Sequence, residues 1–208
     1  MTIAQTHVSA SSDIALWLER ASAWLFASLA LQPPSSATID EMTRLVPSLP
    51  PAMKAAAAEI VALPLEEWEP EFFSVLGPAG CPACESSYER AAMASRGPLL
   101  AAVAAYYEAF VYVPAPLREV PDHIAVELGF LSFMALKIAF ARFESRVDDA
   151  GVALEAYEKF QRRHLGVWAQ TLCAALAETG SPQYQLVARL LQCVISPSDP
   201  PVSSRPLS

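Results

Sequence analysis

The chain has 208 residues, of which 53% are hydrophobic and only 17% charged, so it can bury the core of one domain and disorder is excluded over most of its length. Its formal net charge of -8 at pH 7 disfavours a nucleic-acid partner, because an acidic surface repels a phosphate backbone, and favours basic peptides or basic protein surfaces. Only seven glycines stand beside long alanine- and leucine-rich runs, which favours helices over a β-sandwich or barrel.

The first residues show neither the cationic region nor the apolar run of a secretory signal. No stretch of about 18 uninterrupted apolar residues predicts a membrane-spanning helix. With no export signal, the four cysteines are expected to be reduced thiols. We therefore expect a cytoplasmic protein that does not insert stably into a membrane.

Prolines, glycines and capping residues divide the chain into helical segments. Ser12 or Asp13 is expected to cap the first helix, and Pro51 to begin the third. Two prolines and two glycines exclude regular structure at 77–84, and 85–94 are expected to form a short helix or an ordered loop. Helices are predicted over residues 13–32, 37–46, 51–63, 66–76, 99–112, 121–144, 152–178 and 183–195.

This pattern predicts three regions. Residues 1–11 are expected to form a flexible N-terminus, and residues 12–195 a single all-α domain, a bundle of about eight to nine helices. Residues 196–208, rich in proline and serine, are expected to form a disordered tail.

The predicted helix at 121–144 is the most apolar segment and must be almost surrounded by other helices. Pro121 suits its first position, and Asp122 places negative charge at the positive end of the helix dipole. Its first turn also carries His123 and Glu127, four residues apart on one face. These two side chains either pair with each other and fix the turn, or supply two ligands of a metal site.

Two other features invite a chemical interpretation. Cys81 and Cys84 form a CxxC pair, but a structural zinc site requires a second pair of ligands and none follows, so we interpret this as a loop sequence without metal. His164 lies on an otherwise apolar stripe and is expected to be a satisfied core or boundary residue. No phosphate-binding loop and no nucleophile motif is present, so no catalytic residue is predicted.

Three segments together resemble one protein family. A Gly/Pro-containing loop leads into Glu85-Ser86-Ser87-Tyr88, a second segment reads Glu-Val-Pro-Asp-His from Glu119 with Glu-Leu from Glu127, and a late segment reads His-Leu-x-x-Trp from His164. In this order they resemble the TorD/DmsD/NarJ-type redox-enzyme maturation chaperones, over about residues 13–195. The serine at 87, where valine is common, departs from the pattern, and the cysteine pair is not part of it.

The resemblance implies an all-helical cytoplasmic chaperone that is not an enzyme and holds no cofactor or metal. Its partner would be the precursor of a molybdoenzyme catalytic subunit of the dimethyl-sulfoxide-reductase class. The chaperone would bind the twin-arginine signal peptide or N-terminal region until the molybdenum cofactor is inserted, acting as a monomer or homodimer. The client-binding positions that it suggests are Glu85, Ser86, Tyr88, Pro121, Asp122, His123, Glu127, Trp68 and Phe72.

A twin-arginine signal is a cationic segment followed by an apolar one, so its receptor should combine carboxylates with apolar side chains. The carboxylates of Glu85, Asp122 and Glu127 are expected to bind the arginines. The side chains of Tyr88, Trp68 and Phe72 are expected to line the apolar part of the site. Two alternatives remain at this stage. One is a metal- or small-ligand-binding helical enzyme that uses His123 and Glu127, and the other is a helical scaffold that the same motifs merely stabilise.

Overall fold

The computed structural model describes residues 2–77, 79–88, 96–114 and 120–196, with side chains from residue 11 onward. Within these ranges the chain forms nine α-helices and two 3₁₀ turns and no β-strand, which confirms the all-α prediction. The elements are α1 (Thr2–Ala30), α2 (Ser36–Leu45), η1 (Val46–Ser48), α3 (Pro51–Val61), α4 (Leu65–Val75), η2 (Glu85–Ser87), α5 (Arg96–Phe110), α6 (Ile124–Phe143), α7 (Val147–Arg163), α8 (Leu165–Ala177) and α9 (Pro182–Ile195).

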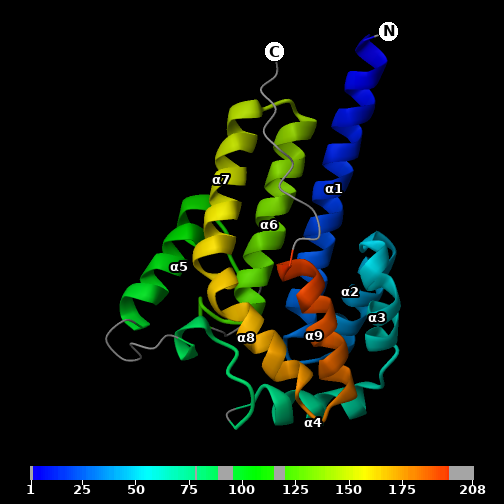
Figure 1. Ribbon diagram of the computed structural model, residues 1–208, viewed down its shortest axis with the longest axis vertical. Coiled ribbons are helices and arrows are strands. Elements are labelled where there is room, and N and C mark those ends of the chain that lie inside the picture. Colours follow the sequence, from blue (N-terminus) through cyan, green and yellow to red (C-terminus); the bar gives the residue numbers. More distant parts are fainter. Residues whose placement is uncertain (1, 78, 89–95, 115–119, 197–208) are drawn as a thin grey trace.

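Helix α6 runs along α1 in the opposite direction, and α7 lies on its other side (Figure 1). Polar contacts fix the pairing of α6 with α1 along its length. The Ser28 hydroxyl donates to the carbonyl of Ala125 at 2.7 Å, and the Ser132 hydroxyl donates to the carbonyl of Ala21 at 2.8 Å. At the far end Arg142 pairs with Asp13. The remaining helices pack around this central group.

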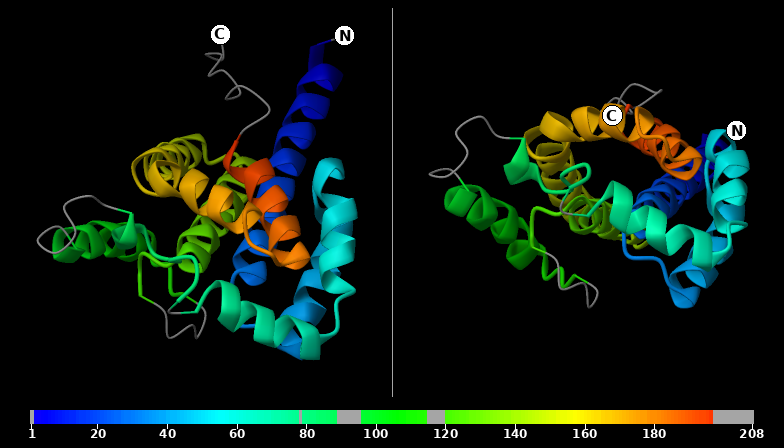
Figure 2. Two further views of the ribbon diagram at one scale, coloured as in Figure 1. Left: turned by 60° about the horizontal axis from the view of Figure 1, so that its bottom comes forward. Right: turned by 90° about the horizontal axis from the view of Figure 1, so that it is seen from below.

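Helices α2, α3 and α4 lie on one side of the molecule and α5 on the other, as the two turned views show (Figure 2). The chain crosses between these sides through the loop after α4 and through η2. This crossing brings η2 to the N-terminal end of α6, where the candidate site is found.

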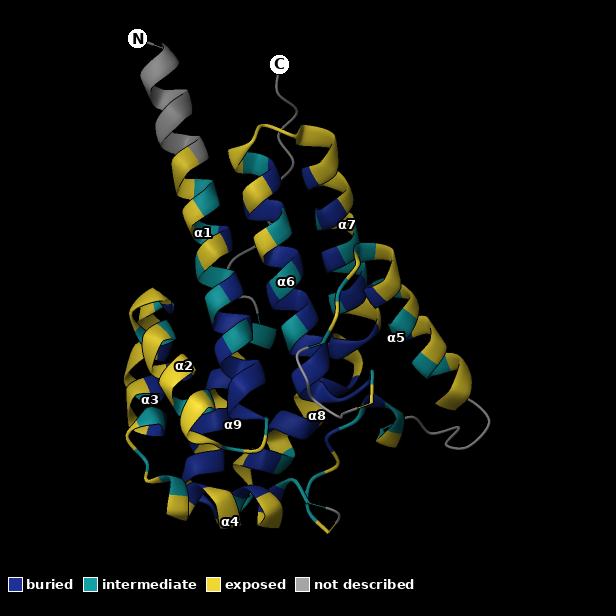
Figure 3. Ribbon diagram, turned by 180° about the vertical axis from the view of Figure 1, so that it is seen from behind, coloured by how far each residue is buried: buried dark blue, intermediate teal, exposed yellow. Residues whose placement is uncertain are grey.

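By length and composition alone, α6 could cross a membrane, but 72% of its most apolar window is buried inside the protein. It is therefore the core helix of the bundle, as its apolar stripe predicted. The outward face of its C-terminal half is the exception, and Figure 3 shows this part of α6 without another helix in front of it.

The predicted start of α6 at Pro121 is wrong. The helix begins at Ile124, with His123 as its N-cap residue in an extended conformation (φ −75°, ψ 137°). The His123 Nδ1 atom accepts from the backbone N–H of Ala125 at 3.3 Å. Pro121 and Asp122 precede the helix because their backbone pairs with another loop instead, as described below.

The single helix predicted over residues 152–178 is also wrong, because the chain forms α7 and α8 with a break at His164 (φ −113°, ψ −88°). Helix α8 leaves α7 at a wide angle (Figure 1). At this break the backbone comes close to itself, since a Cβ atom on Gly166 would lie 2.8 Å from the carbonyl oxygen of Gln161. The apolar stripe continues through the break with helical spacing, and so gave no sign of it.

Helix α1 begins at Thr2, so the predicted cap at Ser12 or Asp13 is wrong. Residues 2–11 contain no proline or glycine that would stop a helix, and the Asp13 side chain pairs with Arg142 instead of capping. Residues 77 and 79–84 have no regular structure, as predicted, and η2 follows. The rest of the predicted 85–94 segment from residue 89, linker residues 115–118 and the tail from residue 197 lie outside the described residues.

Candidate functional site

Two segments that are far apart in the sequence, residues 83–88 and 120–124, meet in an antiparallel backbone pairing. Cys84 and His123 form an isolated β-bridge. On either side of it, the N–H of Glu85 donates to the carbonyl of Asp122 at 2.9 Å, and the N–H of Ile124 donates to the carbonyl of Ala83 at 2.8 Å. The start of α6 is therefore fixed by tertiary backbone hydrogen bonds, which explains why it begins after Pro121.

The side chain of Asp122 adds a further link between the two segments. Its Oδ2 atom accepts from the backbone N–H of Ser86 at 2.9 Å. The Tyr88 hydroxyl then closes the loop by donating to the carbonyl of Pro82 at 2.9 Å. These bonds hold η2 and the following tyrosine against the N-terminal end of α6.

Three carboxyl groups and one imidazole gather behind this pairing, and we call Glu85, Asp122, Glu127 and His164 the acidic cluster. Their exposed fractions are 4%, 0%, 0% and 7%. The carboxylate of Glu85 lies 3.1 Å from the His164 Nδ1 atom. Charged groups are seldom so deeply buried unless they are paired, so this cluster is the chief electrostatic feature of the described interior.

Glu127 lies deepest in the cluster. Burial raises the pKa of its carboxyl well above the usual 4.5, and the charges of Glu85 and Asp122 act in the same direction. The indole N–H of Trp168, which donates to the Oε2 atom of Glu127 at 3.4 Å, partly opposes this pKa shift. The protonated form of Glu127 is therefore favoured.

Aromatic side chains enclose the cluster. The rings of Phe160 and Tyr106 lie 5.0 and 5.6 Å from the His164 ring, measured between centroids. The Tyr88 ring lies 5.2 Å from that of Trp168. The Tyr107 hydroxyl donates to the carbonyl of Pro121 at 2.8 Å, which ties α5 to the same junction.

Two polar atoms of the cluster have no hydrogen-bond partner among the described residues: the Oε1 atom of Glu127, on the carboxyl whose protonated form is favoured, and the Oδ1 atom of Asp122. The Oδ1 atom of Asp122 is buried and accepts no hydrogen bond, although its Oδ2 atom does. A buried acceptor without a donor is costly, so a donor supplied by a ligand would be favourable here. A guanidinium group is one such donor.

Seven of the nine predicted client-binding residues meet at this junction. Asp122, His123, Glu127 and Glu85 are buried, whereas Ser86, Tyr88 and Pro121 are partly exposed along its edge. The other two, Trp68 and Phe72, lie on α4 with 0% and 8% of their surface exposed and belong to the hydrophobic core. In this conformation neither can line an open surface.

Three further residues contact the junction but were not among the nine positions predicted from the sequence: Tyr107, His164 and Trp168. His164 is buried and hydrogen-bonded, which confirms the expectation of a satisfied core residue, but its partner is a residue of the predicted site. The sequence did indicate two of them, because His164 and Trp168 belong to the His-Leu-x-x-Trp segment of the family resemblance. For Tyr107 the sequence gave only an aromatic pair at the end of α5.

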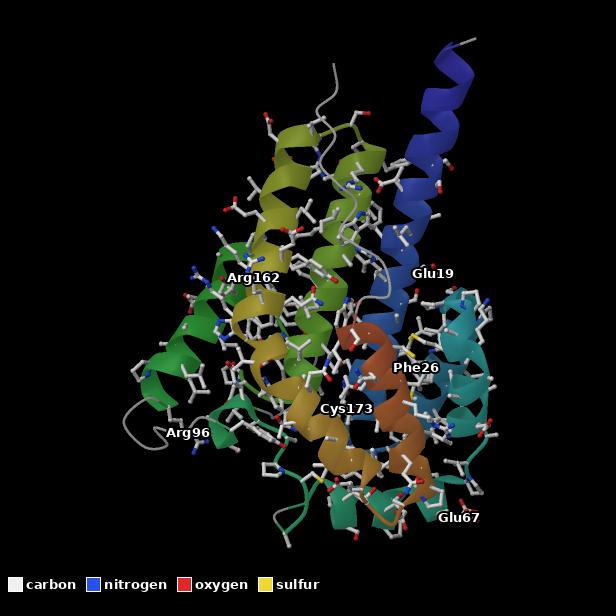
Figure 4. The ribbon with its side chains drawn as sticks, in the orientation of Figure 1. Glu19, Phe26, Glu67, Arg96, Arg162 and Cys173 are labelled. Carbon is white, nitrogen blue, oxygen red and sulfur yellow. The ribbon has the colours of Figure 1, made fainter. Side chains whose placement is uncertain are left out.

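The described residues contain no group of three or more histidine, cysteine or acidic side chains placed to hold a metal ion. Cys81, Cys173 and Cys193 are free thiols. Cys173 lies between α8 and α9 (Figure 4), where its thiol contacts the carbonyl oxygen of Ala188 at 3.0 Å. It is thus part of the packing.

A cleft of about 510 Å³ lies beside the junction, and residues of α4, of the loop that precedes η2 and of the α8–α9 turn line it. Pro82, the acceptor of the Tyr88 hydroxyl, belongs to this lining. A second cleft of about 380 Å³ lies between α1, α3, α7 and α9, away from the cluster. The first cleft therefore adjoins the partly exposed edge of the site.

A family model described as nitrate reductase delta subunit matches residues 40–174, almost two thirds of the chain. The matched range contains the acidic cluster, both segments of the backbone pairing and Trp168. No curated protein gave a significant match.

Proposed function

The chain belongs to the nitrate reductase delta subunit family, and we propose that it binds the twin-arginine signal peptide or N-terminal region of a molybdoenzyme catalytic subunit before the cofactor is inserted. Membership of this NarJ/TorD-type family makes the chain a non-catalytic redox-enzyme maturation chaperone, and implies a nitrate-reductase-type molybdoenzyme subunit as its partner. We further propose that the chain acts in the cytoplasm and that residues of the acidic cluster bind this segment.

The convergence of the two motif segments on the acidic cluster carries this proposal. Glu85 and Asp122 come from different parts of the chain, yet backbone and side-chain hydrogen bonds join them at one junction. A core rarely holds three carboxyl groups without a function, since each is costly to bury. A cationic segment is the ligand that such a group of carboxyls favours, and the net charge of -8 would attract it from a distance.

We infer that an arginine of the client donates to the Oδ1 atom of Asp122, an acceptor without a partner. Ser86, Tyr88 and Pro121 form the partly exposed edge through which it would approach. The positive charge of the arginine would also lower the raised pKa of the nearby Glu127 carboxyl. Access requires a small displacement of η2, which few hydrogen bonds hold against α6.

The apolar part of the client segment would lie along Tyr88 and the adjoining cleft. Phe72 and Trp68 would contact it only after a shift of α4, because both are buried in the described conformation. Until then we expect them to support the cleft from beneath, where Val75 of the same helix forms part of its wall.

The alternative of a metal- or ligand-dependent enzyme built on His123 and Glu127 has little support. The Glu127 carboxyl is fully buried and bonded to Trp168, and the family is non-catalytic. The scaffold alternative does not account for the acceptor of Asp122 that is left without a donor.

The proposal can be tested with a synthetic twin-arginine leader peptide and the variant Asp122→Asn. An asparagine oxygen can still accept from the Ser86 amide, so the loop should stay in place while the charge is lost. We expect the affinity to fall about tenfold or more, the usual effect of losing a charge-assisted hydrogen bond. Titration calorimetry at low ionic strength measures it.

Asp148→Asn is the matched control, since this exposed residue of α7 changes the net charge by the same amount away from the junction. It should bind the leader like the wild type. Equal loss in both variants would mean that only the overall charge matters. Unchanged affinity in a folded Asp122→Asn protein would remove Asp122 from the site.

A further inference from the structure

Helix α6 carries an exposed apolar stripe on the outward face of its C-terminal half. Leu136, Phe140 and Phe143 expose 36%, 58% and 73% of their surface, and the partly buried Phe133 begins the stripe one turn earlier. Figure 3 shows this part of α6 between α1 and α7 without a helix covering it. Exposed apolar residues that stand singly are common on proteins, but a continuous stripe on the core helix marks an interaction surface.

Tyr112, which follows α5, lies beside the first residue of this stripe. The Tyr112 ring packs on the Phe133 ring with 5.3 Å between centroids. Its two neighbours, Val111 and Val113, expose 79% and 80% of their surface. We call Phe133, Leu136, Phe140 and Phe143 the outer α6 face.

The outer α6 face contains no carboxylate, although the chain is strongly acidic. The only acidic residue within α6 is Glu127, which is fully buried in the acidic cluster. Lys137 lies beside the stripe, and its ammonium lies over the Phe133 ring at 5.1 Å. Glu144, just beyond the helix, is paired with Arg146. Two acidic copies of this chain could therefore approach through this face without bringing carboxylates together.

The spacing of the stripe is the same in both directions. From Phe133 the steps to Leu136, Phe140 and Phe143 are three, four and three residues. Steps of three and four place residues along one side of a helix, in the pattern by which two helices interlock. When two such stripes lie antiparallel, Phe133 of one copy meets Phe143 of the other, and Leu136 meets Phe140.

We propose that the outer α6 face is the interface of a two-fold symmetric homodimer in which the α6 helices of two copies pack antiparallel. A two-fold interface requires a self-complementary surface, and the symmetric spacing supplies it. With about 200 Å² for a fully exposed ring, Phe140 and Phe143 alone offer on the order of 250 Å² of apolar surface. That is roughly a third of the approximately 800 Å² that each partner buries in a standard interface, and Leu136 and Phe133 add to it.

The dimer leaves the acidic cluster of each copy free, because Glu127 points to the opposite side of α6, toward Trp168 of α8. The proposal is therefore independent of the proposed client binding. A dimer of this chaperone would offer two client sites.

Sedimentation equilibrium of the full chain over a wide range of concentrations tests the proposal. The wild type should reach twice its chain mass of 22.4 kDa. Phe140→Glu should weaken dimerisation at least about 100-fold, since two symmetry-related carboxylates would be buried in the apolar interface. Phe143→Glu, at the end of the helix, should act in the same direction and serves if the first variant folds poorly.

Phe73→Glu is the matched control, because Phe73 of α4 is 59% exposed and lies outside the outer α6 face. It should dimerise like the wild type, and circular dichroism should show unchanged helix content in all variants. A wild type that stays monomeric at every concentration would overturn the proposal, as would a dimer that survives Phe140→Glu and Phe143→Glu. If a monomeric wild type loses affinity for the leader peptide on Phe140→Glu, the face belongs to the client instead.

Discussion

The carboxylate of Glu85 lies 3.1 Å from the Nδ1 atom of His164, although the two residues are 79 positions apart in the chain. Glu85 begins η2, and His164 is the residue at which α7 ends and α8 begins. Their contact joins the loop after α4 to the break between two helices. It therefore sets the orientation of α8, and with it the position of Trp168 beside Glu127.

The first prediction concerns this pair. His164→Ala should lower the free energy of unfolding by about 3 kcal/mol at neutral pH, because it leaves the buried Glu85 carboxylate without its imidazole partner. His164→Gln should cost less, since the amide can still donate to the carboxylate. Urea unfolding of the three proteins measures the difference.

The exposed ion pair between Glu155 and Lys159 provides the control. Lys159→Ala should change stability little, because solvent screens pairs at the surface. If His164→Ala were as mild as this control, the Glu85 contact would not stabilise the fold.

Hydrophobic spacing predicted most of the fold, because nearly every helix buries one apolar face. It failed at His164, since Phe160, His164 and Trp168 follow one another at steps of four as in a continuous helix. At the break His164 contacts Glu85, which is remote in sequence. Tertiary contacts of this kind override local preference, and no periodicity reveals them.

The first residue of α6 is likewise determined by tertiary contacts that the local sequence does not reveal. Pro121 and Asp122 have the local features of a first turn, but the N–H of Ile124 bonds to Ala83 in another loop. Only the family resemblance brought these segments together, because their motifs occur in the same proteins. The sequence also did not predict that the apolar stripe on α6 is exposed. A helix that is apolar on all sides does not indicate which of its faces stays in contact with solvent.

The second prediction tests the backbone at the α7–α8 break. Gly166→Ala should destabilise the protein by about 1–3 kcal/mol, because its Cβ would lie 2.8 Å from the carbonyl oxygen of Gln161. Gly151→Ala should instead stabilise it by about 0.5–1 kcal/mol, since Gly151 is an exposed residue of α7 with no atom near the added methyl. Thermal unfolding of both variants measures the opposite signs. Equal effects would mean that the break has no need of glycine.

A third prediction concerns the contact between α1 and α7. The Trp24 indole N–H donates to the Tyr157 hydroxyl at 2.9 Å, and both residues are buried. Tyr157→Phe should cost about 1–2 kcal/mol in chemical denaturation, because it leaves the N–H without an acceptor. Ser22→Ala is the contrast, since the Ser22 hydroxyl donates to the carbonyl of Leu18 at an exposed position, where water can replace the hydrogen bond and its removal should cost little. The reverse order of costs would contradict this assignment.

The last prediction is a pH dependence that arises from Glu127. Its pKa in the folded state is raised well above 4.5, chiefly by burial and then by Glu85, so the folded protein binds a proton that the unfolded chain releases above pH 4.5. This contribution to stability is fully present below pH 4.5 and is lost as the pH rises toward the pKa of the folded state, by up to about 1.4 kcal/mol for each pH unit. Glu127→Gln resembles the protonated side chain and can still accept from Trp168, so its stability should stay flatter as the pH rises. Denaturant unfolding of both proteins at several pH values from 4.5 to 8 measures the divergence. The exposed Glu155→Gln should follow the wild-type curve closely, and a Glu127→Gln curve parallel to the wild type would show that Glu127 is ionised in the folded protein.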